Sequence, residues 1–197
     1  MNQASSDDNS SAARLPAEDR QALLRTATDS IAHGLRHGRP LAVNTEKFSE
    51  PLRLQRASFV TLEMHDQLRG CIGMLEAVRP LIVDVAENAY AAAFRDPRFM
   101  PVTVTEFPDL TVHISILSPP EPISFADQDD LLRQIRPNVD GLILADGQRR
   151  GTFLPAVWES LPEPEEFLRH LKLKAGLPAE HWSDTVKVWR YTTESVP

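Results

Sequence analysis

The sequence predicts an α+β protein in which a largely antiparallel sheet is flanked by helices, with a smaller lobe beside it. Two patterns indicate this class: amphipathic helical stripes occur between strand segments, and most neighbouring strands are separated only by short turns. A doubly wound parallel sheet would need a helical crossover between consecutive strands. The 197 residues are enough for one sizeable core. We expect residues 1–14 to form a disordered polar tail and residues 15–197 to form a single domain.

The composition narrows the function classes. The chain carries 28 acidic and 21 basic residues and has a formal net charge of −7, so we do not expect nucleic acid as a partner. One cysteine excludes a disulfide within the chain and a metal cluster built from several of its thiolates. No secretory signal or membrane-length apolar run is recognisable, which predicts a cytoplasmic protein without membrane contact. No glycine-rich phosphate loop or nucleophile elbow is present, and we predict no cofactor.

The first predicted element is a helix that begins near Leu15 and is ended by Gly38 and Pro40. Its apolar residues recur at helical spacing and form one stripe: Leu23, Leu24, Ala27, Ile31 and Leu35. His33 and His37 lie four residues apart, which is a spacing that a metal site can use. Two histidines are only half of such a site, and histidines in a last turn also interact favourably with the helix dipole. We therefore predict no metal here.

Residues 58–73 predict a β-hairpin, because two runs rich in β-branched and aromatic residues flank a polar break at residues 65–67. The second arm contains Gly70 and Gly73. Glycine is normally avoided inside a strand, since it packs nothing and costs backbone entropy. The two glycines therefore indicate a bend, a bulge, or a point where another group approaches the backbone closely.

The only cysteine, Cys71, lies between these two glycines. Because side chains alternate along a strand, Arg69 and Cys71 are expected on one face. A guanidinium at that distance favours the thiolate, which is the reactive form of cysteine. The alternative is an inert apolar residue, since free cysteines are often buried in the core.

Leu81 to Phe94 predict a helix with a broad apolar face and an alanine-rich end that allows close packing. The helix stops at Asp96-Pro97, because the residue before a proline resists the α region. Two roles for Arg98 follow. It pairs with Asp96 to fix the turn after the helix, or it binds an anion beside the cysteine strand.

Leu110 to Leu117 alternate between apolar and polar residues, which predicts a strand with one polar face. His113 lies on that face. It would be the base for Cys71 if the two strands are neighbours and their register brings the side chains together. The alternative is an ordinary half-exposed histidine on a strand.

The remaining elements occupy the C-terminal part of the chain. They are a helix at 127–136 with Asp127 as its N-cap, a hairpin over 141–154 that turns at Asp146-Gly147, a helix at about 165–175, and a strand at 185–191. Arg149 and Arg150 begin the second arm of that hairpin. They reach an anionic ligand or are simply solvated.

The hexapeptide Leu68 to Gly73 resembles the signature of the AMMECR domain family, whose microbial members are called AmmeMemoRadiSam system protein A. The resemblance runs from about Leu15 to Tyr191. Further matching segments follow in the same order: 57–62, 88–89, 92–94, 96–99, 114–120, 141–144, 150–155, 167–168 and 171–178. His113 departs from the pattern, which favours an acidic residue there. The family name implies a pathway shared with Memo-like and radical SAM proteins.

Two functional hypotheses follow. In the first, the protein is a thiol-dependent enzyme that uses Cys71 on a small anionic or nucleotide-like substrate, with His113 moving protons. The substrate-binding candidates are Arg69, Gly70, Gly73, Arg98 and Arg150. In the second, the protein is a non-catalytic accessory module, and the glycine-flanked arm forms a backbone groove that serves Memo-like and radical SAM partners.

Overall fold

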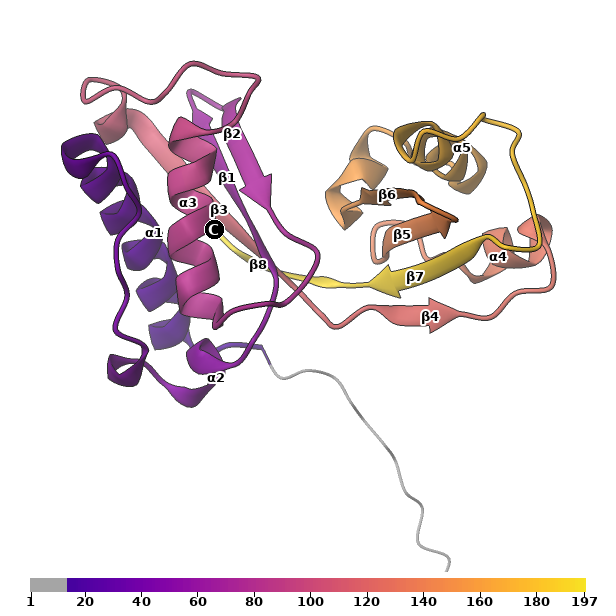
Figure 1. Cartoon of the computed structure of the whole chain (residues 1–197), viewed down its shortest axis with the longest axis horizontal. Helices are drawn as coiled ribbons and strands as arrows, with labels where there is room; N and C mark the ends of the chain where they lie inside the picture. The colour runs from indigo at the N-terminus through magenta and orange to yellow at the C-terminus, as the bar shows by residue number, and fades with distance from the viewer. Residues whose placement is uncertain (1–13) are drawn as a thin grey trace, which may run out of the picture.

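Residues 14–197 are described by a computed structural model, and their strands form two four-stranded antiparallel sheets. The predicted tail of residues 1–14 lies outside the described residues, except for Arg14. The α+β prediction is confirmed. The strands fall into two sheets where the sequence predicted one sheet with a smaller lobe, and each sheet has its own helices (Figure 1).

The first half of the fold contains the sheet with the strand order β2-β1-β3-β8. Its strands are β1 (Ser58–Met64), β2 (Gln67–Gly73), β3 (Leu110–Leu117) and β8 (Thr193–Val196). Two long helices, α1 (Ala17–His37) and α3 (Leu81–Phe94), cover one face of this sheet, and the short α2 (Glu50–Arg53) lies close to them (Figure 1). The start and end of α3 are those that the sequence predicted.

The second half contains the sheet with the order β4-β7-β5-β6. Its elements are β4 (Glu121–Ile123), α4 (Gln128–Gln134), β5 (Gly141–Asp146), β6 (Arg149–Phe153), α5 (Pro164–Lys174) and β7 (Lys187–Tyr191). The chain enters this half from β3 into β4 and returns from β7 into β8 (Figure 1). Among the helices of residues 14–197, none is both long enough and apolar enough to cross a membrane.

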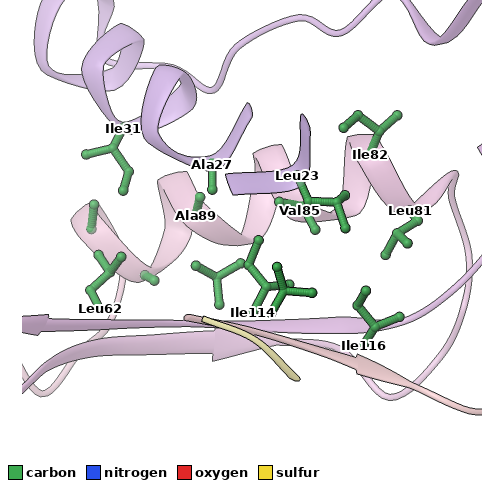
Figure 2. Packing of buried hydrophobic residues seen from close by; sticks show 14 of the residues in the cluster. Leu23, Ala27, Ile31, Leu62, Leu81, Ile82, Val85, Ala89, Ile114 and Ile116 are labelled. Carbon is green, nitrogen blue, oxygen red and sulfur yellow. The ribbon is translucent and has the colours of Figure 1, made fainter. Parts of the chain in front are cut away.

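The main core of the first half lies between the two long helices and the sheet. Figure 2 shows Leu23, Ala27 and Ile31 of α1 directed toward α3 and the strands. These three residues are fully buried, as the stripe in the sequence predicted. The left-handed Gly38 caps α1, with its N–H donated to the carbonyl of Gly34 at 2.8 Å.

The second half has a separate core. Trp158 stacks on Phe167 with the ring centroids 3.7 Å apart, and its indole N–H donates to the carbonyl of Asp140. Asp127 caps α4 as predicted, because its carboxylate accepts from the N–H of Asp130. The hairpin of β5 and β6 turns at Gly147-Gln148, one residue later than Asp146-Gly147, and Gly147 takes the positive φ of +58°.

The predicted hairpin of residues 58–73 is formed by β1 and β2. Its two-residue turn consists of His65 and Asp66, both with positive φ, which matches the twist of the strands. The register shifts so that Arg69 has no partner on β1, and this is a β-bulge. One of the three interpretations of the glycines, a bulge in the second arm, is therefore realised beside Gly70.

The close approach that Gly70 indicated is made by α3. A Cβ atom added at Gly70 would clash with the carbonyl oxygen of Ala92, and one added at Gly73 would clash with the ring of Phe59. The absence of side chains at these two positions lets β2 lie directly against α3 and β1. The alanine-rich end of α3 is the partner surface.

Gly70→Ala is expected to lower the free energy of unfolding by about 2 kcal/mol, since the backbone of Ala92 must shift to admit the methyl group. Urea unfolding of the whole chain measures this. Gly38→Ala is the matched control: nothing lies within 4 Å of its added Cβ atom, so only the left-handed φ costs stability, by about 1 kcal/mol. Equal losses in the two variants would contradict the steric explanation.

Candidate functional site

A cleft opens between the two halves of the fold. It consists of two adjoining hollows of about 460 and 450 Å³, which share Phe59, Thr152 and Lys174 as lining residues. Phe59 belongs to β1, whereas Thr152 and Lys174 belong to β6 and α5 of the second half. Cys71 lines the first of the two hollows. The volumes are in the range of small-molecule sites.

Cys71 is half-buried, and both polar groups of its backbone are held by side chains. Its N–H donates to Oδ2 of Asp96 at 2.9 Å, and its carbonyl accepts from Nη2 of Arg98 at 3.3 Å. Because β2 is the edge strand of its sheet, these two groups would otherwise lack a partner strand. The sulfur accepts a hydrogen bond from the hydroxyl of Thr61 at 3.3 Å.

Asp96 and Arg98 form a tight ion pair at 2.7 Å. Asp96 is buried, but hydrogen bonds from the Arg98 side chain keep the pKa of its carboxyl well below the usual range. The same contacts raise the pKa of Arg98. The pair is therefore fully charged at neutral pH. Arg98 thus makes the contacts with Asp96 that its predicted role in fixing the turn requires. Its side chain is half-exposed and also lines the hollow that contains Cys71.

Lys174 is the cation that the sequence did not single out. It lies at the end of α5 and lines both hollows, with its ammonium 4.9 Å from the ring centroid of Phe153. Within residues 14–197, no carboxylate pairs with it. Burial lowers its pKa, the negative charge of an ionised Cys71 opposes that shift, and the charge of Arg98 adds to it.

Arg69 does not line the cleft. Its guanidinium pairs with Glu106 at 2.9 Å and donates to the carbonyl of Met100, and only 11% of its side chain is exposed. The pKa of Glu106 is lowered to about 2, chiefly by the hydrogen bond from Arg69. Arg69 thus fixes the loop after α3 against β2, and the bulge gives it this direction. The sequence predicted it beside the thiol.

His113 is not placed to be a base for Cys71. The condition for that role was a neighbouring strand, but β1 lies between β2 and β3. Cys71 on β2 and His113 on β3 both lie opposite Thr61 of β1, one on each side of it. Their backbones are therefore two strand spacings apart, which is about 10 Å in total. The imidazole of His113 instead lies 3.3 Å from the carboxylate of Glu63.

The other predicted residues divide between the cleft and the scaffold. Gly73 and Arg150 line the second hollow, and Arg150 reaches Glu76 at 3.3 Å with both side chains exposed. Gly70 faces α3 and not the cleft. On α1, the rings of His33 and His37 lie 4.4 Å apart, and residues 14–197 contain no group of three potential metal ligands around them or elsewhere.

The comparisons with known proteins decide the family. The AMMECR1 family model matches residues 24–196. The chain belongs to the AMMECR1 family. The resemblance of the hexapeptide is thereby confirmed. A Methanothermobacter thermautotrophicus protein is 38% identical over 92% of this chain and 95% of its own, and a Thermotoga maritima protein is 40% identical over 83% and 90%.

The chain also resembles a protein of known structure. The crystal structure of an uncharacterised Pyrococcus horikoshii protein, PH0010, is 33% identical and covers 92% of each chain with a TM-score of 0.84. Because the match covers 92% of each chain, it extends over both halves of the fold and therefore over both walls of the cleft.

Asp96→Asn is expected to lower the free energy of unfolding by about 2 kcal/mol at pH 7, because the neutral amide loses the ion pair with Arg98. The folded pKa of Asp96 lies below its unfolded value of about 3.9, so the stabilisation is present above that value and is lost as the pH falls. The difference between wild type and variant should therefore shrink from pH 5 to pH 3 in chemical denaturation.

The control for this measurement is Asp129→Asn, which removes an exposed carboxylate on α4. It should change stability by less than about 0.5 kcal/mol. A loss in Asp96→Asn that is the same at pH 7 and pH 3 would mean that the charge of Asp96 is not the source of the stabilisation.

Proposed function

We propose that the cleft binds a small anionic molecule and that Cys71 is its reactive group, which makes the protein a thiol-dependent enzyme. One observation carries the proposal: Cys71 lines the same hollow as Arg98 and Lys174, which reach it from opposite halves of the fold. A thiol sealed in the core would have no such surroundings.

The charges of the cleft favour an anion. Arg98 is matched by Asp96, and Arg150 lies opposite Glu76, whereas Lys174 has no acidic partner within residues 14–197. The cleft therefore carries one positive charge in excess, and that charge borders both hollows. Positive groups near a thiol favour the thiolate, and they also attract an anionic substrate.

The rest of the lining is mostly apolar. Phe59, Leu154 and Val157 surround the hollow that contains Cys71, and Met74 and Leu75 continue the apolar surface into the second hollow. Apolar walls with a few convergent polar groups are typical of small-molecule sites. The substrate class that fits is an anion with an apolar or aromatic body, which includes nucleotide-like molecules.

Each group then has a role. Cys71 is the nucleophile, Lys174 and Arg98 bind the anionic part of the substrate and stabilise the thiolate, and Arg150 extends the positive surface at the rim. His113 takes no part. Because the two walls come from different halves, we also propose that residues 15–197 act as one domain.

An accessory module is the second candidate, and the clamped backbone of Cys71 favours it. Asp96 and Arg98 occupy the N–H and the carbonyl of that residue, as a rigid docking arm for Memo-like and radical SAM partners would require. Cys71→Ser separates the two functions: it keeps the shape of the arm and removes the thiol chemistry.

Alkylation by iodoacetamide tests the thiol hypothesis, and it reports on one site because Cys71 is the only cysteine. Cys71 should react faster than free cysteine at pH 7, and Lys174→Met should slow it about threefold by removing the excess positive charge. Lys187→Met is the matched control, since this exposed lysine lies on β7 away from both hollows. A wild-type rate no higher than that of free cysteine, unchanged in Lys174→Met, would contradict the proposal.

A further inference from the structure

A separate pocket of about 300 Å³ lies where the chain enters α1 and passes beside β3 and β8. Arg14, Arg56 and Glu194 line it, together with the hydroxyl-bearing Thr193 and Ser195. None of its lining residues belongs to the cleft that contains Cys71. The pocket therefore requires an explanation of its own.

Two guanidinium groups in this pocket have no partner among residues 14–197. Within residues 14–197, no hydrogen bond or ion pair engages the side chain of Arg14 or Arg56. Arg56 is half-buried, and its pKa is lowered by desolvation, with the charge of Glu194 opposing the shift. A charged group that is withdrawn from water without a partner is costly, so a buried cation normally faces an anion.

Glu194 is the acidic residue that lines this pocket, but its carboxylate only partly balances the two arginines. Its Oε1 accepts a hydrogen bond from the N–H of Leu15 at 2.9 Å, which fixes this carboxylate to the start of α1. A third guanidinium lies nearby, because Nη2 of Arg20 donates to the carbonyl of Ser195 while its buried Nε has no partner. Positive charge exceeds negative charge around the pocket.

We propose that this pocket binds a small oxyanion of the phosphate class. Guanidinium groups present paired N–H donors that match the oxygens of a phosphate, and Arg14 and Arg56 provide them from two chain segments. The volume admits inorganic phosphate or the phosphoryl end of a small phosphomonoester.

The test is a titration of the ¹⁵N-labelled full chain at constant ionic strength, with inorganic phosphate in one arm and glycerol 3-phosphate in the other. The amides of Thr193, Glu194 and Ser195 should shift and saturate. A tighter constant for glycerol 3-phosphate assigns the site to a phosphomonoester, and equal constants assign it to the free ion; either supports the site.

Three variants show which groups bind. Arg14→Met and Arg56→Met should each weaken phosphate about tenfold, since each loses charge-assisted hydrogen bonds. Glu194→Gln keeps an acceptor for Leu15 and removes a repelling charge, so it should bind phosphate about threefold more tightly. Arg25→Met is the matched control and should bind as wild type does, because this exposed arginine on α1 lines neither this pocket nor the Cys71 cleft.

The proposal is overturned if the amides of residues 193–195 do not saturate, if they saturate equally in Arg14→Met and wild type, or if only residues of the Cys71 cleft respond. Arg14 is exposed and precedes α1, so its variant decides the matter even if Arg56→Met fails to fold. The readout does not involve the thiol. Failure here and failure of the thiol hypothesis are therefore distinguishable.

Discussion

The ion pair of Asp96 and Arg98 closes the free edge of β2 at Cys71, and the geometry of the cleft depends on that closure. An edge strand exposes unpaired backbone groups, which attract other chains or water. Here the two charged side chains occupy the N–H and the carbonyl of one residue. On its other edge β2 pairs with β1, and at Gly70 it lies against the carbonyl of Ala92. The strand is thus held at both edges and on the face that packs against α3. The side chain of Cys71 lies on the remaining face, which borders the second half of the fold.

The opposite wall is fixed by equally close packing. At Gly151 of β6 an added Cβ atom would lie 2.8 Å from the backbone nitrogen of Ala175, so the end of α5 rests directly on the strand. Because Lys174 directly precedes Ala175, this contact places Lys174 at the wall of the cleft. Beside it, the buried hydroxyl of Tyr191 bonds to Thr152 and to the carbonyl of Phe153, and burial raises its pKa to about 12. A neutral phenol thus holds the strand that lines both hollows.

Elements with strong local signals were predictable from the sequence, and those that depend on strand order were not. The helix of residues 81–94 and the cap at Asp127 follow from periodicity and N-cap chemistry. β8 has a single apolar residue, Val196, among polar ones, so its sequence has no strand signal. His113 was misplaced because a sequence does not reveal that β1 separates two strands. Lys174 follows the spacing of a solvated helix face, and only the packing of α5 against β6 brings it to Cys71.

The two halves meet through paired chain connections and a small apolar cluster. The N–H of Ser118 donates to the carbonyl of Thr192 at 2.9 Å, and the N–H of Thr192 donates to the hydroxyl of Ser118 at 3.0 Å. Ile143 and Tyr191 of the second sheet pack against Leu117 of the first sheet and against Ala57, which directly precedes β1. Because the outgoing and returning segments are hydrogen-bonded to each other, they form one two-stranded link. Ser118 and Thr192 also line the pocket of Arg14 and Arg56, so an anion bound there would contact the link between the two halves.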